Sequence, residues 1–243
     1  EQNSPPGKTN IFLSKRARGV FTAYPDMQHF FPHTQVYFLG NPIRENVLSG
    51  LESTASAKEK LGLDKNKLTI LSVGGSLGSR TLNNAWEKLI PQINEQGIQL
   101  IWQTGKTDYQ HIISQNLATE NIQVREFISD MALAYSAADV IVSRAGAIAI
   151  SELAIAGKPI LLVPFPFAAE DHQTKNAMAL VEKNAARMVK DSQMEAVFWQ
   201  TLSEICNNQS LREQMSRNLS LFAKPKATQE IVAQLLEGLS LRP

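Results

Sequence analysis

Residues 139–166 read DVIVSRAGAIAISELAIAGKPILLVPFP, and this stretch decides the fold. Its first five residues, Asp139–Ser143, are an apolar and β-branched run that predicts a strand, and the small residues after it predict a tight turn. Ala147–Ala156 has the composition of a helix, which Gly157 ends before a second strand at Pro159–Val163. The stretch is therefore one βαβ unit, the building block of a parallel sheet.

The helix of this unit carries one residue that does not suit it. The helix is apolar on nearly every side, which indicates burial, yet it contains Glu152. A buried carboxylate is costly unless a partner hydrogen-bonds it. Two interpretations are open: a structural ion pair with a basic side chain, which the residues alone favour, or a ligand site that holds adjacent hydroxyls as acidic residues hold ribose.

Strands and helices alternate in the same way on both sides of this unit. Strands are predicted at Leu68–Val73, Gln99–Gln103, Ile122–Phe127, Asp139–Ser143, Pro159–Val163 and Ala186–Val189, and helices at Ser56–Leu61, Ser79–Gln96, Asp108–Gln115, Met131–Ala137, Ala147–Ala156, Asp171–Asn184, Met194–Asn207 and Leu211–Leu221. This spacing predicts an α/β fold, a Rossmann-like doubly wound parallel sheet of about six strands with helices on both faces.

The remaining segments suggest a division of the chain into three parts. Before the break at Gly40–Arg44, helices are expected at Lys8–Arg18 and Asp26–Phe31, with strands at Val20–Tyr24 and Gln35–Leu39. Two strands are too few for a domain, and the chain begins without methionine. We therefore expect residues 1–42 to be a remnant of an N-terminal domain with its linker, and residues 43–223 to be the main domain. Residues 224–243 would hold an amphipathic helix at Thr228–Leu239.

Composition excludes several classes of function. The chain has 243 residues, 43% hydrophobic and 19% charged, and its net charge of +1 gives no reason to expect a nucleic-acid partner. A single cysteine, Cys206, excludes an internal disulfide framework, and no apolar run has membrane-spanning length. The histidines show no metal-ligand spacing with that cysteine, so no metal or cofactor is predicted. They are His29, His33, His111 and His172.

Two glycine-containing turns follow predicted strands and open helices. In an open α/β sheet this edge binds ligands, and helix N-termini attract phosphates. The first turn, Ser72–Arg80, offers backbone N–H groups and the hydroxyl of Ser76, although a tight turn that needs glycine explains it equally well. The second turn, Arg144–Ala147, has the same placement. Two such turns on one sheet edge suit a diphosphate.

Two further loops leave strands at the same edge. Phe165–Asn176 concentrates polar side chains, and amides such as those of Gln173 and Asn176 suit sugar hydroxyls, although an N-cap by Asp171 is an alternative. In the other loop, the backbone of Ile128 could pair with a nucleobase edge, although a helix cap by the neighbouring Asp130 would explain that loop equally well.

Taken together and in this order, the motifs resemble the MurG family. These are UDP-N-acetylglucosamine transferases that complete lipid II from lipid I in peptidoglycan synthesis. The motifs that carry the resemblance are Glu1-Gln2-Asn3, Gly40–Arg44, Gly74–Gly78, Glu126–Met131, Ser143–Ala147, Ser151–Ala154, Glu170–Gln173 and Asn176-Ala177. The resemblance spans nearly the whole chain. It implies the C-terminal half of a GT-B glycosyltransferase, in which two Rossmann-like domains face each other across a cleft without a metal requirement.

The resemblance also implies roles for single residues toward a UDP-N-acetylglucosamine donor. Glu152 would bind the ribose hydroxyls, while Arg44 and the backbone of Ile128 would serve the uracil. Ser76 and the turn at Ala147 would hold the diphosphate. The sugar hydroxyls would fall to Gln173, with His172, Asn176 and, from across the cleft, Asn3.

For the parent protein, the resemblance implies inverting transfer to lipid I and peripheral association with the cytoplasmic face of the bacterial inner membrane. The acceptor domain, with the catalytic residues, would precede Glu1, so this chain is expected to bind donor without catalysing transfer. The final helix would return to the N-terminal domain. The alternatives are another GT-B UDP-sugar transferase, such as a glycolipid synthase, and a non-catalytic module that binds nucleotide sugars.

Overall fold

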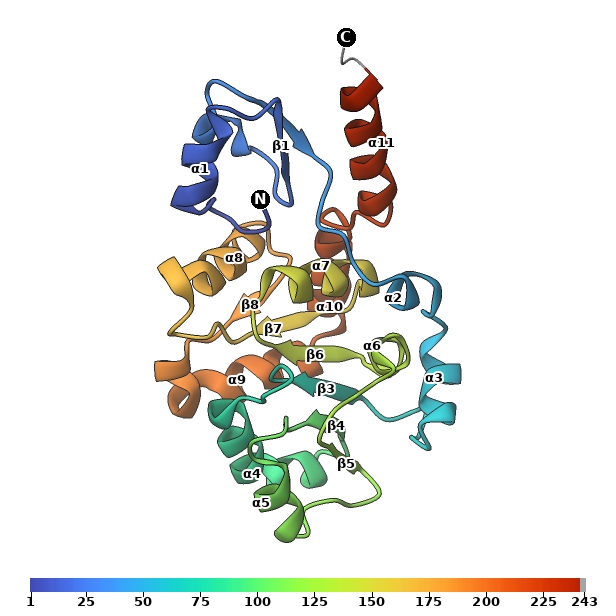
Figure 1. The fold of residues 1–243 in the computed structure, drawn as a ribbon. Coiled ribbons are helices and arrows are strands. Elements are labelled where there is room, and N and C mark those ends of the chain that lie inside the picture. Colours follow the sequence, from blue (N-terminus) through green and yellow to red (C-terminus); the bar gives the residue numbers. More distant parts are fainter. Residues whose placement is uncertain (241–243) are drawn as a thin grey trace.

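The computed structural model describes residues 1–240, and its centre is a six-stranded parallel sheet (Figure 1). The strands are β3 (Thr69–Val73), β4 (Gln99–Gln103), β5 (Ile122–Arg125), β6 (Val140–Ser143), β7 (Ile160–Leu162) and β8 (Arg187–Met188). Their order across the sheet is β5-β4-β3-β6-β7-β8, and every neighbouring pair is parallel. The predicted doubly wound parallel sheet is thereby confirmed.

The direction in which the chain builds the sheet reverses between β3 and β6. From β3 the chain adds β4 and β5 on one side, and from β6 it adds β7 and β8 on the other. The two central strands pair directly, with Val73 opposite Ser143 at their carboxyl ends. Because the loops after these strands lead to opposite faces of the sheet, a crevice opens between them at this edge.

Helices cover both faces of the sheet and create two hydrophobic cores. One core, around Trp86, Trp102 and Phe198, lies under α4 (Arg80–Glu95), α5 (Tyr109–Ser114) and α9 (Met194–Asn207). The other core lies under α3 (Thr54–Lys60), α6 (Met131–Ala137), α7 (Ala147–Ala156) and α8 (His172–Val181). Helix α10 (Gln209–Ser220) contributes to both cores, through Met215 and Leu219.

Local structure departs from the sequence-based expectation in a few places. The helix predicted over Lys8–Arg18 ends at Ser14, and the unpredicted helix α2 (Glu45–Ser49) follows the linker. Asp130 caps α6 as the alternative interpretation of its loop expected, because its Oδ1 accepts the N–H of Leu133 at 3.0 Å. The cap by Asp171, which was the alternative interpretation of the loop Phe165–Asn176, is wrong.

Asp171 lies at the end of the short 3₁₀ turn η2 (Ala169–Asp171), directly before α8. Its φ of +56° is left-handed, whereas a capping residue needs an extended backbone to turn its side chain back onto the helix. Within residues 1–240 its carboxylate accepts no cap hydrogen bond. The helix therefore begins one residue later than predicted and ends at Val181 rather than Asn184.

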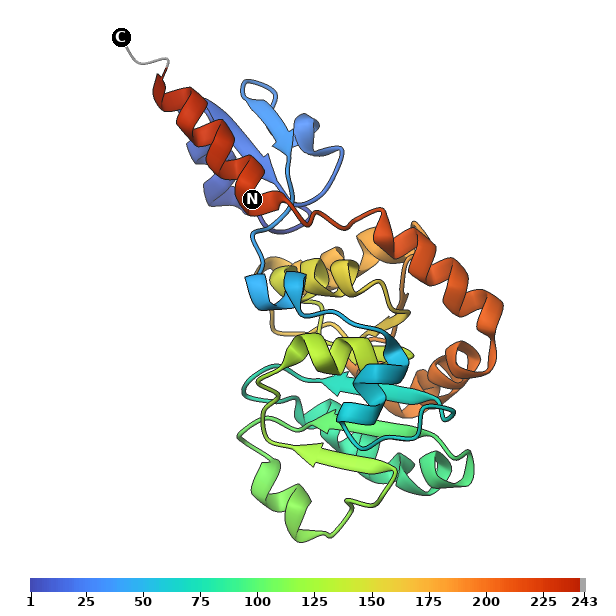
Figure 2. The same cartoon turned by 90° about the vertical axis from the view of Figure 1, so that its right-hand side faces the viewer.

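A small N-terminal unit lies beside the sheet domain, with the last helix next to it (Figure 2). It consists of α1 (Lys8–Ser14), β1 (Gly19–Thr22), η1 (Met27–Phe30) and β2 (Gln35–Phe38), and its two strands are parallel. The last helix, α11 (Ala227–Ser240), contacts this unit where the Arg18 guanidinium donates to the Gly238 carbonyl at 2.8 Å. Residues 241–243 of the predicted third part lie outside the described residues.

Two chain segments cross between the N-terminal unit and the sheet domain. One is the predicted linker at Gly40–Arg44, and the other leads from α10 into α11. They touch each other: a Cβ atom on Gly40 would lie 2.4 Å from Cβ of Lys224, and the Lys224 ammonium lies 4.0 Å from the ring centroid of Phe38. Among residues 1–240, no helix combines the length and the apolar composition needed to cross a membrane.

The core under α9 contains the single cysteine, and this placement predicts how fast its thiol reacts. Cys206 is buried, and burial raises the pKa of its thiol to about 12. Because the thiolate is the reactive form, the native chain should react slowly with a disulfide reagent at pH 8 and quickly after unfolding in urea. Absorbance of the released thiol measures both rates. Equal rates in native and unfolded chains would contradict the buried placement.

Candidate functional site

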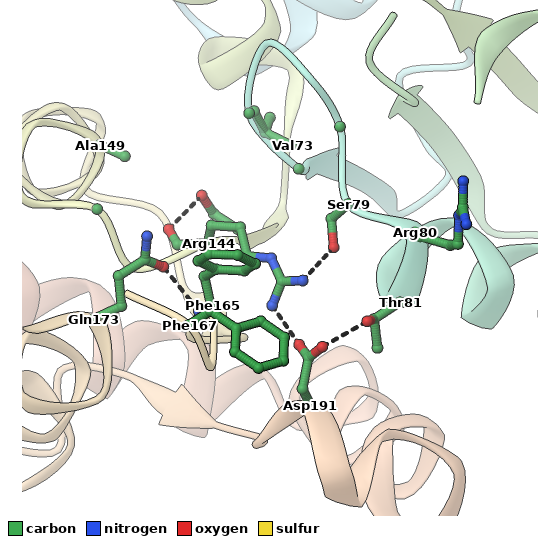
Figure 3. A pocket seen from close by; sticks show the side chains of 15 residues that line it. Val73, Ser79, Arg80, Thr81, Arg144, Ala149, Phe165, Phe167, Gln173 and Asp191 are labelled. Carbon is green, nitrogen blue, oxygen red and sulfur yellow. Dashed lines mark hydrogen bonds and ion pairs between the residues drawn. The ribbon is translucent and has the colours of Figure 1, made fainter. Parts of the chain in front are cut away.

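A cavity of about 500 Å³ lies at the carboxyl edge of the sheet, where β3 and β6 part (Figure 3). Its size is in the range of small-molecule sites. The loops after β3, β6, β7 and β8 all contribute to its wall. The lining residues are Val73, Gly74, Gly75, Gly78, Ser79, Arg80, Thr81, Ser143, Arg144, Gly146, Ala149, Phe165, Phe167, Gln173 and Asp191.

The glycine-rich turn after β3 is fixed by a close approach of two backbones. Gly78 and Gly105 have φ values of +87° and +78°. A Cβ atom on Gly105 would lie 2.1 Å from the backbone nitrogen of Gly78, and one on Gly78 would lie 2.0 Å from the Thr104 carbonyl oxygen. Glycine is thus required here for the turn itself. The predicted Ser76 lies on the exposed tip of this turn, outside the cavity lining.

The turn after β6 presents a helix terminus to the cavity. Helix α7 begins after Gly146, and within residues 1–240 no side chain caps its N-terminus. The first N–H groups of a helix lack intrahelical acceptors and carry the positive end of its dipole. Gly146 and Ala149 on this turn both line the cavity, with Ala147 between them. The arrangement suits an anionic ligand group.

Arg144 is the centre of a network between loops. Its Nη1 donates to the carbonyls of Val163 (3.0 Å) and Pro164 (3.1 Å) and pairs with Oδ1 of Asp191, while its Nη2 donates to Oγ of Ser79 at 2.5 Å. One side chain thereby joins the loops that follow β3, β6, β7 and β8. Both members of the ion pair are largely buried and line the cavity.

The Asp191 carboxylate of this network also accepts a hydrogen bond from helix α4. Thr81, in the first turn of α4, donates its hydroxyl to Oδ2 of Asp191 at 2.5 Å (Figure 3). A carboxylate beside an anion-binding turn would repel an anionic ligand, and the paired guanidinium compensates that charge. Sequence analysis did not identify this network. Its one available signal was that Asp191 follows shortly after the last predicted strand.

Glu152 has protein partners on both of its oxygens. Nε and Nη2 of Arg44 donate to Oε1 and Oε2 at 2.9 and 3.0 Å, and the Tyr135 hydroxyl donates to Oε2 at 3.2 Å. The carboxylate is buried, whereas half of the Arg44 side chain is exposed. Burial, with the nearby carboxylate, raises the pKa of Tyr135, which keeps its donor proton in place. The structure thus contains the ion pair that the residues alone favoured.

The backbone of Ile128, predicted to face a nucleobase, is partly occupied. Its N–H donates to Oε1 of Gln103 at 3.0 Å, and Nε2 of the same glutamine donates to the Gly75 carbonyl at 3.1 Å. Gln103 therefore ties the glycine-rich turn to the loop after β5. The carbonyl of Ile128 is the group left for a ligand.

Gln173 is the predicted sugar-binding residue that lines the cavity. Its Oε1 accepts the N–H groups of Ala145 (3.1 Å) and Phe165 (2.9 Å), so one amide braces the loops after β6 and β7. Its Nε2 has no partner among residues 1–240 and remains a donor. Beside it, Nε2 of His172 is buried without a hydrogen-bond partner in the described chain, 3.7 Å from Oε2 of Glu170.

Asn176 and Asn3, both expected to bind sugar hydroxyls, are hydrogen-bonded to each other. Asn176 is fully buried and donates to Oδ1 of Asn3 at 3.0 Å, while its own Oδ1 accepts the N–H of Ser4 at 2.8 Å. A second contact of this kind joins Asn41 to Ser151 on α7 at 3.1 Å. The first pair fastens the N-terminal segment to α8 and the second fastens the linker to α7, and none of these residues lines the cavity.

The comparisons with known proteins agree with this geometry. Residues 69–231 match the model of the glycosyltransferase family 28 C-terminal domain. The chain belongs to this family. Proteins of Cytophaga hutchinsonii and Flavobacterium psychrophilum, 45% and 42% identical over 98% of the chain, are both named UDP-N-acetylglucosamine–N-acetylmuramyl-(pentapeptide) pyrophosphoryl-undecaprenol N-acetylglucosamine transferase. These names confirm the resemblance that the motifs indicated.

A solved structure supports the same assignment of the family 28 domain. The crystal structure of MurG from Acinetobacter baumannii is 33% identical and superimposes with a TM-score of 0.76 over 98% of this chain and 65% of that one. The chain covers 64% of each of the two curated relatives. It thus spans a little less than two thirds of their length.

The close approach of Gly105 to Gly78 in this family 28 domain can be tested by adding one methyl group. Gly62 is a matched control for Gly105, because its φ is +69° and its Cβ direction faces open space. Gly62→Ala should lower the free energy of unfolding by about 1–2 kcal/mol, the cost of a left-handed alanine. Gly105→Ala should cost about 1–3 kcal/mol more through overlap with Gly78. Urea unfolding followed by circular dichroism measures both, and equal losses would contradict the close approach.

The hydrogen bond from Tyr135 to Glu152 can be tested by removing one hydroxyl group, with Tyr24 as the matched control. Tyr24 is also a buried tyrosine, but its hydroxyl has no hydrogen-bond partner among residues 1–240. Tyr135→Phe should lower the free energy of unfolding by about 1.5–3 kcal/mol, because a bond to a charged group is lost. Tyr24→Phe should leave it unchanged or raise it. A similar loss in both variants would show that the carboxylate does not depend on Tyr135.

Proposed function

We propose that this chain is the donor-binding part of a glycosyltransferase that moves N-acetylglucosamine from UDP-N-acetylglucosamine to lipid I and so forms lipid II. The observation that carries the proposal is the cavity between the two turns at the reversal of strand order. It combines the free N-terminus of α7 with the Arg144 guanidinium. The two curated relatives that align with this part of the chain carry the name of that transferase.

The donor can be placed by the chemistry of each loop. The diphosphate lies against Ala147 at the start of α7, close to Arg144, with the Ser76 hydroxyl at the tip of the opposite turn. The uracil pairs with the carbonyl of Ile128. The sugar lies toward Nε2 of Gln173, with His172 behind it. Asn3 and Asn176 then act indirectly, by holding the N-terminal unit against α8.

The ribose site requires a rearrangement of the ion pair. A carboxylate has about four lone-pair positions, and Arg44 and Tyr135 occupy three of those of Glu152. Arg44 is half exposed and lies on the linker, so its side chain can turn away toward the base while Tyr135 keeps the carboxylate in place. The ribose hydroxyls then take the acceptor positions that Arg44 leaves.

In the transfer step, the lipid I hydroxyl attacks the anomeric carbon with inversion, UDP leaves, and the hydroxyl proton passes to a base that we assign to the part of the relatives' length that this chain does not span. Negative charge grows on the leaving diphosphate, where the N–H groups of α7 and the Arg144 guanidinium can stabilise it. Acceptor binding is assigned to the part of the relatives' length that this chain does not span. Because the acceptor in the relatives' name is a polyprenyl lipid, we place the parent protein peripherally at the cytoplasmic face of the bacterial inner membrane.

Calorimetric titration of the chain with UDP and with 2′-deoxy-UDP tests the ribose assignment. The wild type should bind UDP more tightly than its deoxy analogue. Glu152→Ala should weaken UDP binding about tenfold or more, because bonds to a charged group are worth about 1.5–3 kcal/mol each. In this variant the difference between the two nucleotides should disappear.

Glu182→Ala, an exposed acid at the end of α8, is the control and should bind both nucleotides like the wild type. Retention of the wild-type preference for UDP in Glu152→Ala would refute the ribose assignment. A further titration with UDP-glucose separates the alternatives, since equal affinity for UDP-glucose and UDP-N-acetylglucosamine would favour a different GT-B sugar transferase.

A further inference from the structure

Two exposed aromatic rings stand at the rim of the cavity, on the loop after β7. Phe167 is 84% exposed and Phe165 is 41% exposed, and both line the cavity. Their ring centroids are 5.7 Å apart at an interplanar angle of 72°, an edge-to-face pair. Leaving large apolar rings in water is unfavourable, so a pair of them beside a cavity indicates a contact surface.

Side chains of Gln173 and Arg144 hold the loop that carries the rings. The N–H of Phe165 donates to Oε1 of Gln173 at 2.9 Å, and the Arg144 guanidinium lies 5.7 Å from the Phe165 ring centroid. Figure 3 shows both rings beside the Arg144 side chain. The residues that brace the cavity therefore also hold Phe165, and Phe167 packs against the Phe165 ring.

We propose that Phe165 and Phe167 form an aromatic wall against which the transferred sugar of the donor lies. A pyranose ring has apolar faces of C–H groups, which favour contact with the electron-rich face of an aromatic ring. The neighbouring Nε2 of Gln173 offers a hydrogen bond to a hydroxyl on the same sugar. A ring wall with an adjacent amide recognises a hexose, whereas a bare diphosphate needs neither.

This inference rests on the proposed function, because it presumes that the diphosphate occupies the turn before α7. It assigns the sugar end of the same cavity and predicts that the aromatic pair affects sugar binding without affecting nucleotide binding. A wall that instead contacts another part of the parent protein would leave both affinities unchanged when the rings are removed.

The test compares UDP with UDP-N-acetylglucosamine by calorimetry in the wild type and in Phe167→Ala. Phe167 is chosen because its exposed ring can be removed without opening the core. We expect about a three- to tenfold weaker affinity for UDP-N-acetylglucosamine, the usual size of an aromatic contact, with less than a twofold change for UDP. Phe167→Trp should keep the affinity for UDP-N-acetylglucosamine, and its added fluorescence should change with that ligand but not with UDP.

Phe12→Ala is the matched control, because Phe12 is 71% exposed on α1 and lies outside the cavity lining. It should change neither affinity. If Phe167→Ala binds both ligands like the wild type, or loses both equally, the aromatic wall is overturned while the proposed function stands. If the wild type binds neither ligand, the proposed function and the wall are overturned together.

Discussion

The pairing of β3 with β6 is the constraint on which the rest of this structure depends. Every other strand extends outward from these two, and the helices after them are sent to opposite faces. The turns after β3 and β6 therefore diverge, and their polar groups line the cavity between them. The cavity is a consequence of strand order, and the loops then supply its chemistry.

Charge in and beside the cavity is balanced by partners within the protein. Arg144 is compensated by Asp191, and the Glu152 carboxylate is compensated by Arg44. The proposed donor offers a partner of suitable charge or polarity to one member of each pair: phosphate oxygens to Arg144, and ribose hydroxyls to Glu152. Donor binding would exchange one set of polar contacts for another, which limits the cost of desolvation. It would also make the affinity sensitive to residues that hold a ligand-binding side chain in place, such as Asp191.

The sequence predicted local elements well and long-range contacts poorly. Ala147–Ala156 was placed correctly, because Gly146, Gly157 and the apolar run specify the helix locally. The partners of Glu152 were not predicted, because Tyr135 and Arg44 reach it only through the packing of α6 and the path of the linker. Asp171 failed as a cap for a local reason: aspartate suits both an extended capping backbone and a left-handed one, so its residue type does not distinguish the two. The amide of Asn176 is suited to bind sugar hydroxyls, but its contacts with Asn3 and Ser4 depend on where the N-terminal unit lies.

The double crossing between the N-terminal unit and the sheet domain has a mechanical consequence. A single linker can rotate about its backbone bonds, so two structural units joined by one chain segment can rotate relative to each other. Here two segments run side by side and touch where Gly40 meets Lys224. Twisting would wind one segment around the other, whereas bending across their common line strains neither. Bending that opens the space in front of α7 and α8 has to break the hydrogen bonds of Asn176 with Asn3 and Ser4, so the paired segments and these bonds together hold the N-terminal unit in place.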